Sequence, residues 1–184
     1  MLNVAAIWTA DVQQQTYRSL LDAMSHPGIV KPILWQEEGS VSTTAVLAAL
    51  LDCEVTLSDH DNLLCQQDWL RLQVEKAEPD QADYILCKAV NAPEFVPKLG
   101  TLTSPEQSAT LILQLDTLVD GELKFQLSGP GVDGQISSAV SGLHEEWLSR
   151  RQEWVYAFPL GVDILFVDQS GVMALPRTTH LELI

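Results

Sequence analysis

The stretch Val162-Asp163-Ile164-Leu165-Phe166-Val167 is followed, after the turn residues Asp168-Gln169-Ser170-Gly171, by Val172-Met173-Ala174-Leu175. Both apolar runs have the length and the residue types of buried strands, and the short polar connection between them is typical of a hairpin. The sequence therefore predicts that the fold ends on two paired strands rather than on a frayed tail.

Arg177 stands directly after this hairpin, in Leu175-Pro176-Arg177-Thr178-Thr179-His180. The preceding proline fixes φ and the threonines Thr178 and Thr179 are stiff at χ1, so the guanidinium leaves from a rigid strand end. We predict that Arg177, with these two threonines, anchors a carboxylate or phosphate. Arg18, in the N-terminal helical pattern, is a candidate second arm of a phosphate clamp. A structural clamp for Arg177 and a surface or interface position for Arg18 remain the alternatives.

Ser128-Gly129-Pro130-Gly131 is the second candidate site. The pattern places it between a strand and a helix that begins near Asp133. Gly129 and Gly131 would let backbone amides approach a ligand, and the helix N-terminus would favour an anion. Turn statistics favour a simpler interpretation, in which the glycines only supply positive φ in a tight turn.

Helical and strand patterns alternate along the chain. Apolar periodicity predicts helices at 11–24, 42–51, 58–75 and from Asp133 through Trp147, the last with Ile136, Val140, Leu143 and Trp147 on one face, and strands at 29–35, 54–57, 84–90, 109–115 and 123–127. This order predicts an α/β fold with a mixed sheet covered on both faces.

Composition limits the class of protein. The chain has 184 residues, 46% of them hydrophobic, which predicts a single domain over 1–184. A formal charge of -15 repels polyanions, so nucleic acid and anionic membranes are poor partners. No apolar run approaches the ~18 residues of a membrane span, and the N-terminus resembles no signal peptide. We expect a cytoplasmic protein.

Cys53, Cys65 and Cys87 are odd in number and far apart, which predicts buried, reduced thiols rather than a disulfide framework or a zinc site. The two acids of Asp59-His60-Asp61 could bind a divalent metal ion. We interpret them instead as acids at the start of a helix, where the helix dipole favours negative charge. His144-Glu145-Glu146 is interpreted as a solvated helix face balanced by Arg150 and Arg151. We predict no metal site.

The hydrolase, zinc-protease and P-loop motifs are absent from the sequence. Paired carboxylates and a nucleophile-base pair are not visible either. We therefore assign no catalytic residue.

Five segments together carry a resemblance to a known family: Ala23-Met24-Ser25-His26-Pro27-Gly28, Leu50-Leu51-Asp52, Leu127-Ser128-Gly129-Pro130-Gly131-Val132, Phe158-Pro159-Leu160-Gly161-Val162-Asp163 and the Arg177 segment. In this order and spacing the chain resembles the PhnH family, a subunit of the bacterial carbon-phosphorus lyase system for phosphonate breakdown. The likeness runs from about Tyr17 to Thr179. It implies a three-layer αβα sandwich, similar to a reduced pyridoxal-phosphate-dependent transferase fold without the cofactor.

A pyridoxal phosphate site would need a lysine for the Schiff base, an acid and a phosphate cradle. Among the lysines only Lys88 lies inside an apolar strand, and a side chain that reaches the strand end is the commoner explanation. The resemblance also implies that the cofactor's residues are lacking. We therefore expect no pyridoxal phosphate.

The resemblance implies a non-catalytic or substrate-shaping subunit, inactive alone. The complex would use ATP and an alkylphosphonate to form α-D-ribose 1-alkylphosphonate 5-triphosphate, with PhnG, PhnI and PhnJ as partners and a homodimer of this chain. One alternative is a stand-alone nucleotide- or phosphonate-binding transferase that uses Arg177 and the Ser128 to Gly131 loop. Another is a scaffold without ligand contact.

Trp154-Val155-Tyr156, beside Phe158-Pro159, is our predicted contact patch for partners. Aromatic residues are common interface anchors, although such a cluster ahead of a buried strand is as often part of the core.

Overall fold

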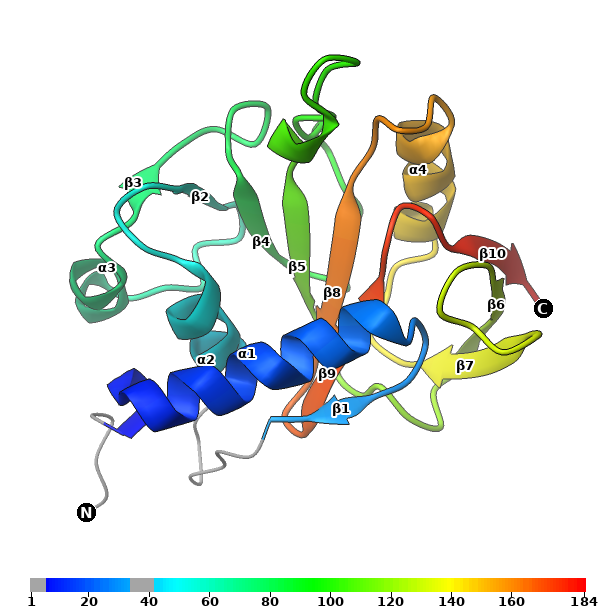
Figure 1. The fold of residues 1–184 in the computed structure, drawn as a ribbon, viewed down its shortest axis with the longest axis horizontal. Helices are drawn as coiled ribbons and strands as arrows, with labels where there is room; N and C mark the ends of the chain where they lie inside the picture. Colours follow the sequence, from blue (N-terminus) through cyan, green and yellow to red (C-terminus); the bar gives the residue numbers. More distant parts are fainter. Residues whose placement is uncertain (1–5, 34–41) are drawn as a thin grey trace.

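The computed structural model describes residues 6–33 and 42–184, and a seven-stranded sheet forms its centre (Figure 1). In spatial order the strands are β1 (Lys31–Pro32), β9 (Gly171–Leu175), β8 (Asp163–Val167), β5 (Thr110–Gln114), β4 (Tyr84–Lys88), β2 (Thr56–Asp59) and β3 (Glu75–Lys76). Neighbours from β3 to β8 are parallel, whereas β9 and β1 are antiparallel to the strands beside them. The predicted mixed sheet in an α/β fold is confirmed.

β8 and β9 form the predicted hairpin, in which Leu165 lies opposite Ala174. The turn between them is organised by the carboxylate of Asp168. It accepts hydrogen bonds from the backbone N–H groups of Ser170 and Gly171, at 2.7 and 2.9 Å. The turn residues were therefore a correct signal, because an aspartate at this position can satisfy the backbone donors that a tight connection leaves open.

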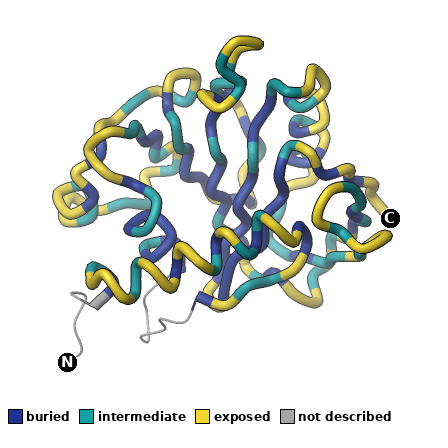
Figure 2. Tube along the Cα trace, in the orientation of Figure 1, coloured by how far each residue is buried: buried dark blue, intermediate teal, exposed yellow. Residues whose placement is uncertain are grey.

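The central strands are buried on both faces, as Figure 2 shows. On β5, Leu111 and Leu113 belong to one hydrophobic core, and Ile112 between them belongs to the other. Successive side chains of a strand point to opposite faces, so a strand covered on both sides needs a continuous apolar run. The segments 111–113 and 164–167 are such runs.

One face of the sheet is covered by α1 (Ala10–Ser25) and α2 (Ser42–Leu50), with the short helix η1 (Ala6–Trp8) ahead of them. α1 buries Thr16, Leu20 and Ala23. The predicted helices at 11–24 and 42–51 are confirmed. Of the predicted strand at 29–35, the structure places β1 at Lys31–Pro32, and Trp35 lies outside the described residues.

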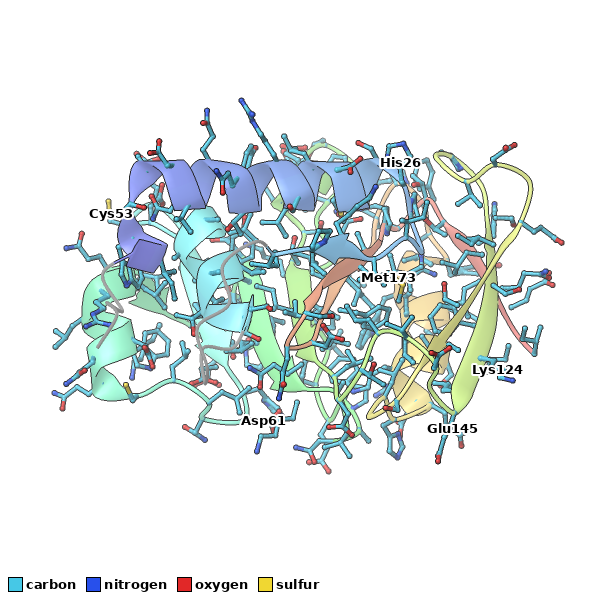
Figure 3. The ribbon with its side chains drawn as sticks, turned by 90° about the horizontal axis from the view of Figure 1, so that it is seen from below. His26, Cys53, Asp61, Lys124, Glu145 and Met173 are labelled. Atoms are coloured by element: carbon cyan, nitrogen blue, oxygen red, sulfur yellow. The ribbon has the colours of Figure 1, made fainter. Side chains whose placement is uncertain are left out.

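The opposite face is covered by α4 (Glu146–Val155) and by a second sheet, of order β10 (His180–Leu183), β6 (Leu123–Ser128), β7 (Ile136–Val140). Figure 3 shows α1 and α4 on opposite sides of the large sheet. The expected αβα sandwich therefore holds in part: one outer layer is helical, and the other combines a helix with strands. The likeness to a pyridoxal-phosphate-dependent transferase fold stays a prediction.

The predicted helix from Asp133 through Trp147 is wrong. Its first half is the strand β7, which pairs antiparallel with β6 so that Ile136 lies opposite Leu127. Gly134 and Gly142 have φ values of +70° and +75°, a left-handed conformation incompatible with a continuous right-handed helix. The helix begins only at Glu146.

The predicted helix at 58–75 is also wrong in its bounds, because α3 spans only Gln66–Leu72. Ser58 is a buried residue of β2, and the capping box is formed by Cys65 and Asp68 instead. The strand expected at 54–57 lies instead at Thr56–Asp59. Residues 57–59 pair with β4 there, and this pairing satisfies their backbone hydrogen-bonding groups.

Of the three thiols, Cys87 is buried, and burial raises its pKa. Cys53 and Cys65 are exposed, so the prediction of buried thiols is wrong for these two. None of the helices within residues 6–33 and 42–184 combines the length and apolar character that a bilayer crossing requires.

Candidate functional site

A cavity of about 790 Å³ lies where the end of β9, the start of β10, the end of β6 and the C-terminal half of α4 meet. Its lining gathers residues that are far apart in the sequence: Ser128, Arg151, Tyr156, Phe158, Arg177, Thr178 and Thr179 are among them. The structure therefore brings two of the sequence candidates, the Arg177 segment and the Ser128 loop, to one place.

The pairing of β6 with β10 explains this convergence. Ser128, at the end of β6, lies opposite His180, at the start of β10. Gly129 follows with φ +117°, and a Cβ there would lie 3.2 Å from the carbonyl oxygen of Thr178. A side chain here would be tight against the Thr178 segment and strained at this positive φ, so glycine is favoured where the two segments cross. Gly131 packs against the end of α1, where a Cβ would lie 2.3 Å from the carbonyl oxygen of Ser25.

The Ser128 to Gly131 loop leads into the strand β7, not into a helix. The predicted helix N-terminus at this loop is therefore wrong, and the macrodipole argument for an anion falls with it. What remains is the tight-turn interpretation, in which Gly129 and Gly131 supply positive φ.

Arg177 has its guanidinium committed to protein acceptors. Nε donates to both carboxylate oxygens of Asp163, at 3.3 and 3.2 Å, and Nη2 donates to Asp163 Oδ2 and to Ser108 Oγ, at 2.6 and 2.5 Å. Nη1 donates to the carbonyl oxygens of Pro105, in η2 (Pro105–Gln107), and of Pro159, at 3.0 and 3.3 Å. A guanidinium has five N–H donors, and here all are used. Arg177 thus has the geometry of the structural clamp.

Arg151 is the functional candidate that sequence reasoning missed. It is only 2% exposed, and its Nη2 donates to the carbonyl oxygens of Pro176 and Thr179, at 2.6 and 2.8 Å. Its Nε has no hydrogen-bond partner among the described residues. Burial lowers the pKa of Arg151 to about 10, and the charge of Asp163 raises it. At neutral pH Arg151 is therefore still a cation.

The expectation that Arg151 balances a solvated acidic face is wrong. α4 buries Trp147, Leu148 and Trp154, and Arg151 lies four residues after Trp147 and three before Trp154. That spacing puts it on the buried stripe of the helix, which was the signal available in the sequence. Arg150 does meet the expectation: it lies 3.9 Å from the Glu146 carboxylate and 3.1 Å from that of Glu153.

Thr179 contributes a second polar atom without a partner. The residue is 3% exposed, and its Oγ1 has no hydrogen-bond partner within the described part of the chain. Its backbone is fixed, because its N–H donates to the Pro176 carbonyl at 3.0 Å and its own carbonyl accepts from Arg151. Thr178, by contrast, is exposed at the cavity.

Arg18 does not join this site. It is an exposed residue of α1, on the opposite face of the large sheet from α4, and it is absent from the described residues that line the cavity. Lys88 is exposed at the end of β4 and is likewise absent from that lining. Its position does not fit a desolvated Schiff-base lysine.

The predicted contact patch is divided by the structure. Trp154 is buried and packs edge-on against Trp147, with ring centroids 6.4 Å apart, so it belongs to the core. Tyr156 and Phe158 are 91% and 65% exposed and lie at the cavity. The four tryptophans within the described residues are buried or half-buried.

Asp59-His60-Asp61 does not start a helix. The Asp59 carboxylate accepts hydrogen bonds from the N–H groups of Leu63 and Leu64, at 2.8 and 2.9 Å. The Asp61 carboxylate accepts from the backbone of Lys88, at 2.7 Å. A second cavity, of about 680 Å³, adjoins this segment. Both acids therefore shape the loop, and nothing in their contacts marks a ligand.

Comparison with known proteins adds an independent observation. Residues 5–182 match the family described as bacterial phosphonate metabolism protein (PhnH). The chain is similar to a Stutzerimonas stutzeri protein assigned as the C-P lyase subunit protein HtxG, with 37% identity over 177 residues, 96% of this chain and 89% of that protein. It is also similar to the alpha-D-ribose 1-methylphosphonate 5-triphosphate synthase subunit PhnH of Rhizobium meliloti (strain 1021), with 29% identity over 188 residues, 92% of this chain and 90% of that protein.

Proposed function

Because this chain belongs to the PhnH family of bacterial phosphonate metabolism proteins, we propose that it is a non-catalytic or substrate-shaping subunit of a carbon-phosphorus lyase complex. In this proposal the complex converts ATP and an alkylphosphonate into α-D-ribose 1-alkylphosphonate 5-triphosphate, and partner subunits supply the reacting groups. The proposal is supported by the R. meliloti relative, which carries the name of a synthase subunit and aligns over 90% of its length.

The structural observation that carries the non-catalytic role is the state of Arg177. This residue lies in the segment 175–180, one of the five that carry the resemblance to the family. Its donors are bound to Asp163, Ser108 and backbone carbonyls. A group held this way stabilises the fold and shapes the cavity wall. It has no free donor to offer a reacting phosphate in this conformation.

Partner contact is proposed at the mouth of the 790 Å³ cavity. Tyr156 and Phe158 present large aromatic surface there, and aromatic side chains are the commonest energetic anchors of protein interfaces. The proposed partners are PhnG, PhnI and PhnJ, together with a second copy of this chain. Since the complex would use ATP, we place it in the cytoplasm, and we propose that the chain itself binds no pyridoxal phosphate.

The alternative is a stand-alone nucleotide- or phosphonate-binding transferase. The cavity itself favours it, because its volume lies within the range of small-molecule sites. The residues first assigned to that role do not: Arg177 is committed internally, and the Ser128 to Gly131 loop opens no helix. Incubation of the isolated chain with ATP and an alkylphosphonate distinguishes the two, because only the alternative requires product formation without partners.

The test of the proposed function is co-purification. The tagged chain is co-expressed with the genes beside its own, and the captured material is measured by native mass spectrometry. We expect a defined complex that contains PhnG, PhnI and PhnJ homologues, and ribose alkylphosphonate triphosphate formation only from that complex. A chain that stays unaccompanied, or that forms this product alone, would contradict the proposal.

A further inference from the structure

We infer that Arg151 and Thr179 form a buried oxyanion site in the 790 Å³ cavity, and that the site takes the phosphate or phosphonate group of a small molecule. The choice of ligand rests on the proposed role in phosphonate breakdown. The site itself rests on contacts in this chain. Thr179 was also selected from the sequence, whereas Arg151 takes the place that the sequence analysis gave to Arg177.

The first step is the charge of Arg151. Removing a guanidinium from water is unfavourable unless an opposite charge or a full set of acceptors replaces the water. Arg151 is only 2% exposed, and it forms no ion pair with any carboxylate of the described residues. The charge of Asp163 raises the pKa of Arg151, but Asp163 forms its ion pair with Arg177.

The second step is the pair of unsatisfied polar atoms. Arg151 Nε and Thr179 Oγ1 are both buried without a hydrogen-bond partner in the described residues. They belong to side chains that are held together, because Arg151 Nη2 donates to the Thr179 carbonyl at 2.8 Å. Buried donors are normally satisfied, so two such atoms beside one cavity indicate an acceptor that binds there.

The third step is the chemical class of that acceptor. A guanidinium edge with an adjacent hydroxyl presents N–H and O–H donors, which match the several acceptor oxygens of a phosphate or phosphonate. Arg177, which also lines the cavity, is neutralised by its ion pair with Asp163. Glu182, the remaining acid of the lining, is exposed on β10. Arg151 therefore supplies the uncompensated buried charge of this cavity, and it is positive.

The experiment uses the full-length isolated chain at constant ionic strength. Inorganic phosphate and methylphosphonate are titrated separately and followed by ³¹P NMR and calorimetry. We expect saturable binding of one or both, and a preference identifies the source of the group. Thr179→Val, which keeps the shape and removes the hydroxyl, is expected to weaken binding about tenfold. Arg151→Gln is expected to abolish it.

Arg150→Gln is the matched control, because it removes the same charge from the neighbouring residue, which already faces Glu146 and Glu153. It should bind like the wild type. If Arg151→Gln fails to fold, Thr179→Val alone decides the question, with its fold checked by circular dichroism.

The inference is overturned if neither probe binds beyond matched chloride, if folded Thr179→Val binds as tightly as wild type, or if acetate binds as well as methylphosphonate. None of these outcomes changes the result expected from the co-purification test of the subunit role. A failed complex with intact phosphate binding would instead reject the proposed subunit role and keep the site.

Discussion

Arg151 and Arg177 line the same cavity, but their guanidinium groups have different surroundings. Arg177 is bound to Asp163 and to acceptors from two further segments, so it ties the start of β8 to η2 and to the turn at Pro159. Arg151 is more deeply buried and has two carbonyl acceptors and, within the part of the chain that the structure describes, no carboxylate. At the residue scale, the first is a structural tie and the second is the proposed ligand group.

Arg177→Ala is expected to destabilise the fold by about 3 kcal/mol, because it leaves the mostly buried Asp163 carboxylate without its counter-charge. Arg150→Ala, which breaks exposed ion pairs, should change stability by less than about 1 kcal/mol. Urea unfolding of both variants measures the difference. Equal midpoints would show that the Arg177 network is not a stabilising clamp.

The carboxyl group of Asp83 provides a prediction about pH. Burial raises its pKa, but hydrogen bonds from Lys98 and from the side chain and backbone of Thr56 outweigh this, so the pKa lies below the ordinary value. A lowered folded-state pKa gives stability that is present above the unfolded-state pKa, about 4, and is lost as the pH falls through the folded-state value.

Asp83→Asn should therefore be less stable than wild type at pH 7, and the gap should narrow below about pH 4. Asp80→Asn removes the same charge from an exposed position of the same segment and serves as control. Unfolding free energies at several pH values test this. A gap that stays constant down to the acid limit would contradict the linkage.

At the element scale, the segment 133–145 shows how pairing overrides periodicity. Apolar residues at Ile136 and Val140 fit one face of a helix, yet they occupy a strand because β6 offers an antiparallel partner. Gly142, which turns the chain after β7, has φ +75°, and a Cβ there would lie 2.6 Å from Asp116 Oδ2. Gly134 has φ +70° with open space around it.

Gly134→Ala and Gly142→Ala separate the two contributions. Gly134→Ala should cost about 1 kcal/mol, the strain of a left-handed alanine, whereas Gly142→Ala should cost about 3 kcal/mol, because the clash with Asp116 is added. Thermal and urea unfolding of the two variants provide the comparison. Equal losses would mean that Asp116 moves aside freely.

At the scale of the whole molecule, two features support the proposed role as a subunit. The family match covers residues 5–182, so the likeness to the family is not confined to one segment of the chain. The exposed aromatic residues Tyr156 and Phe158 lie beside the cavity that holds Arg151. A partner bound there would cover the proposed oxyanion site and place its own reacting groups beside it.

The double variant Tyr156→Ala, Phe158→Ala is expected to weaken partner capture by at least about tenfold, because exposed aromatic residues at an interface centre carry much of its binding energy. Leu70→Ala is the control, since Leu70 is a comparably exposed apolar residue of α3, and α3 lies on the other side of the fold from α4 and β10 (Figure 1). Co-purification yields of the two variants measure the effect. Similar losses in both would remove the cavity mouth as the contact surface.

The sequence by itself determined the hairpin of β8 and β9, the mixed sheet and the helices α1 and α2, because these depend on local signals. Continuous apolar runs, an Asp-containing turn and a 3.6-residue stripe act within a few residues of each other. The segments around Ser128 and Arg177, which the transferase alternative used together, do adjoin one cavity because β6 pairs with β10, and their role as a binding site stays a prediction.

Only the tertiary structure decided which groups in that site are free. Whether an arginine is a tie or an open donor depends on acceptors more than twenty residues away in the chain, such as the Pro105 carbonyl for Arg177 and the Thr179 carbonyl for Arg151. The same holds for β7, whose hydrogen bonds come from β6. Hydrogen-bond satisfaction is a property of packed neighbours, and local periodicity carries no information about it.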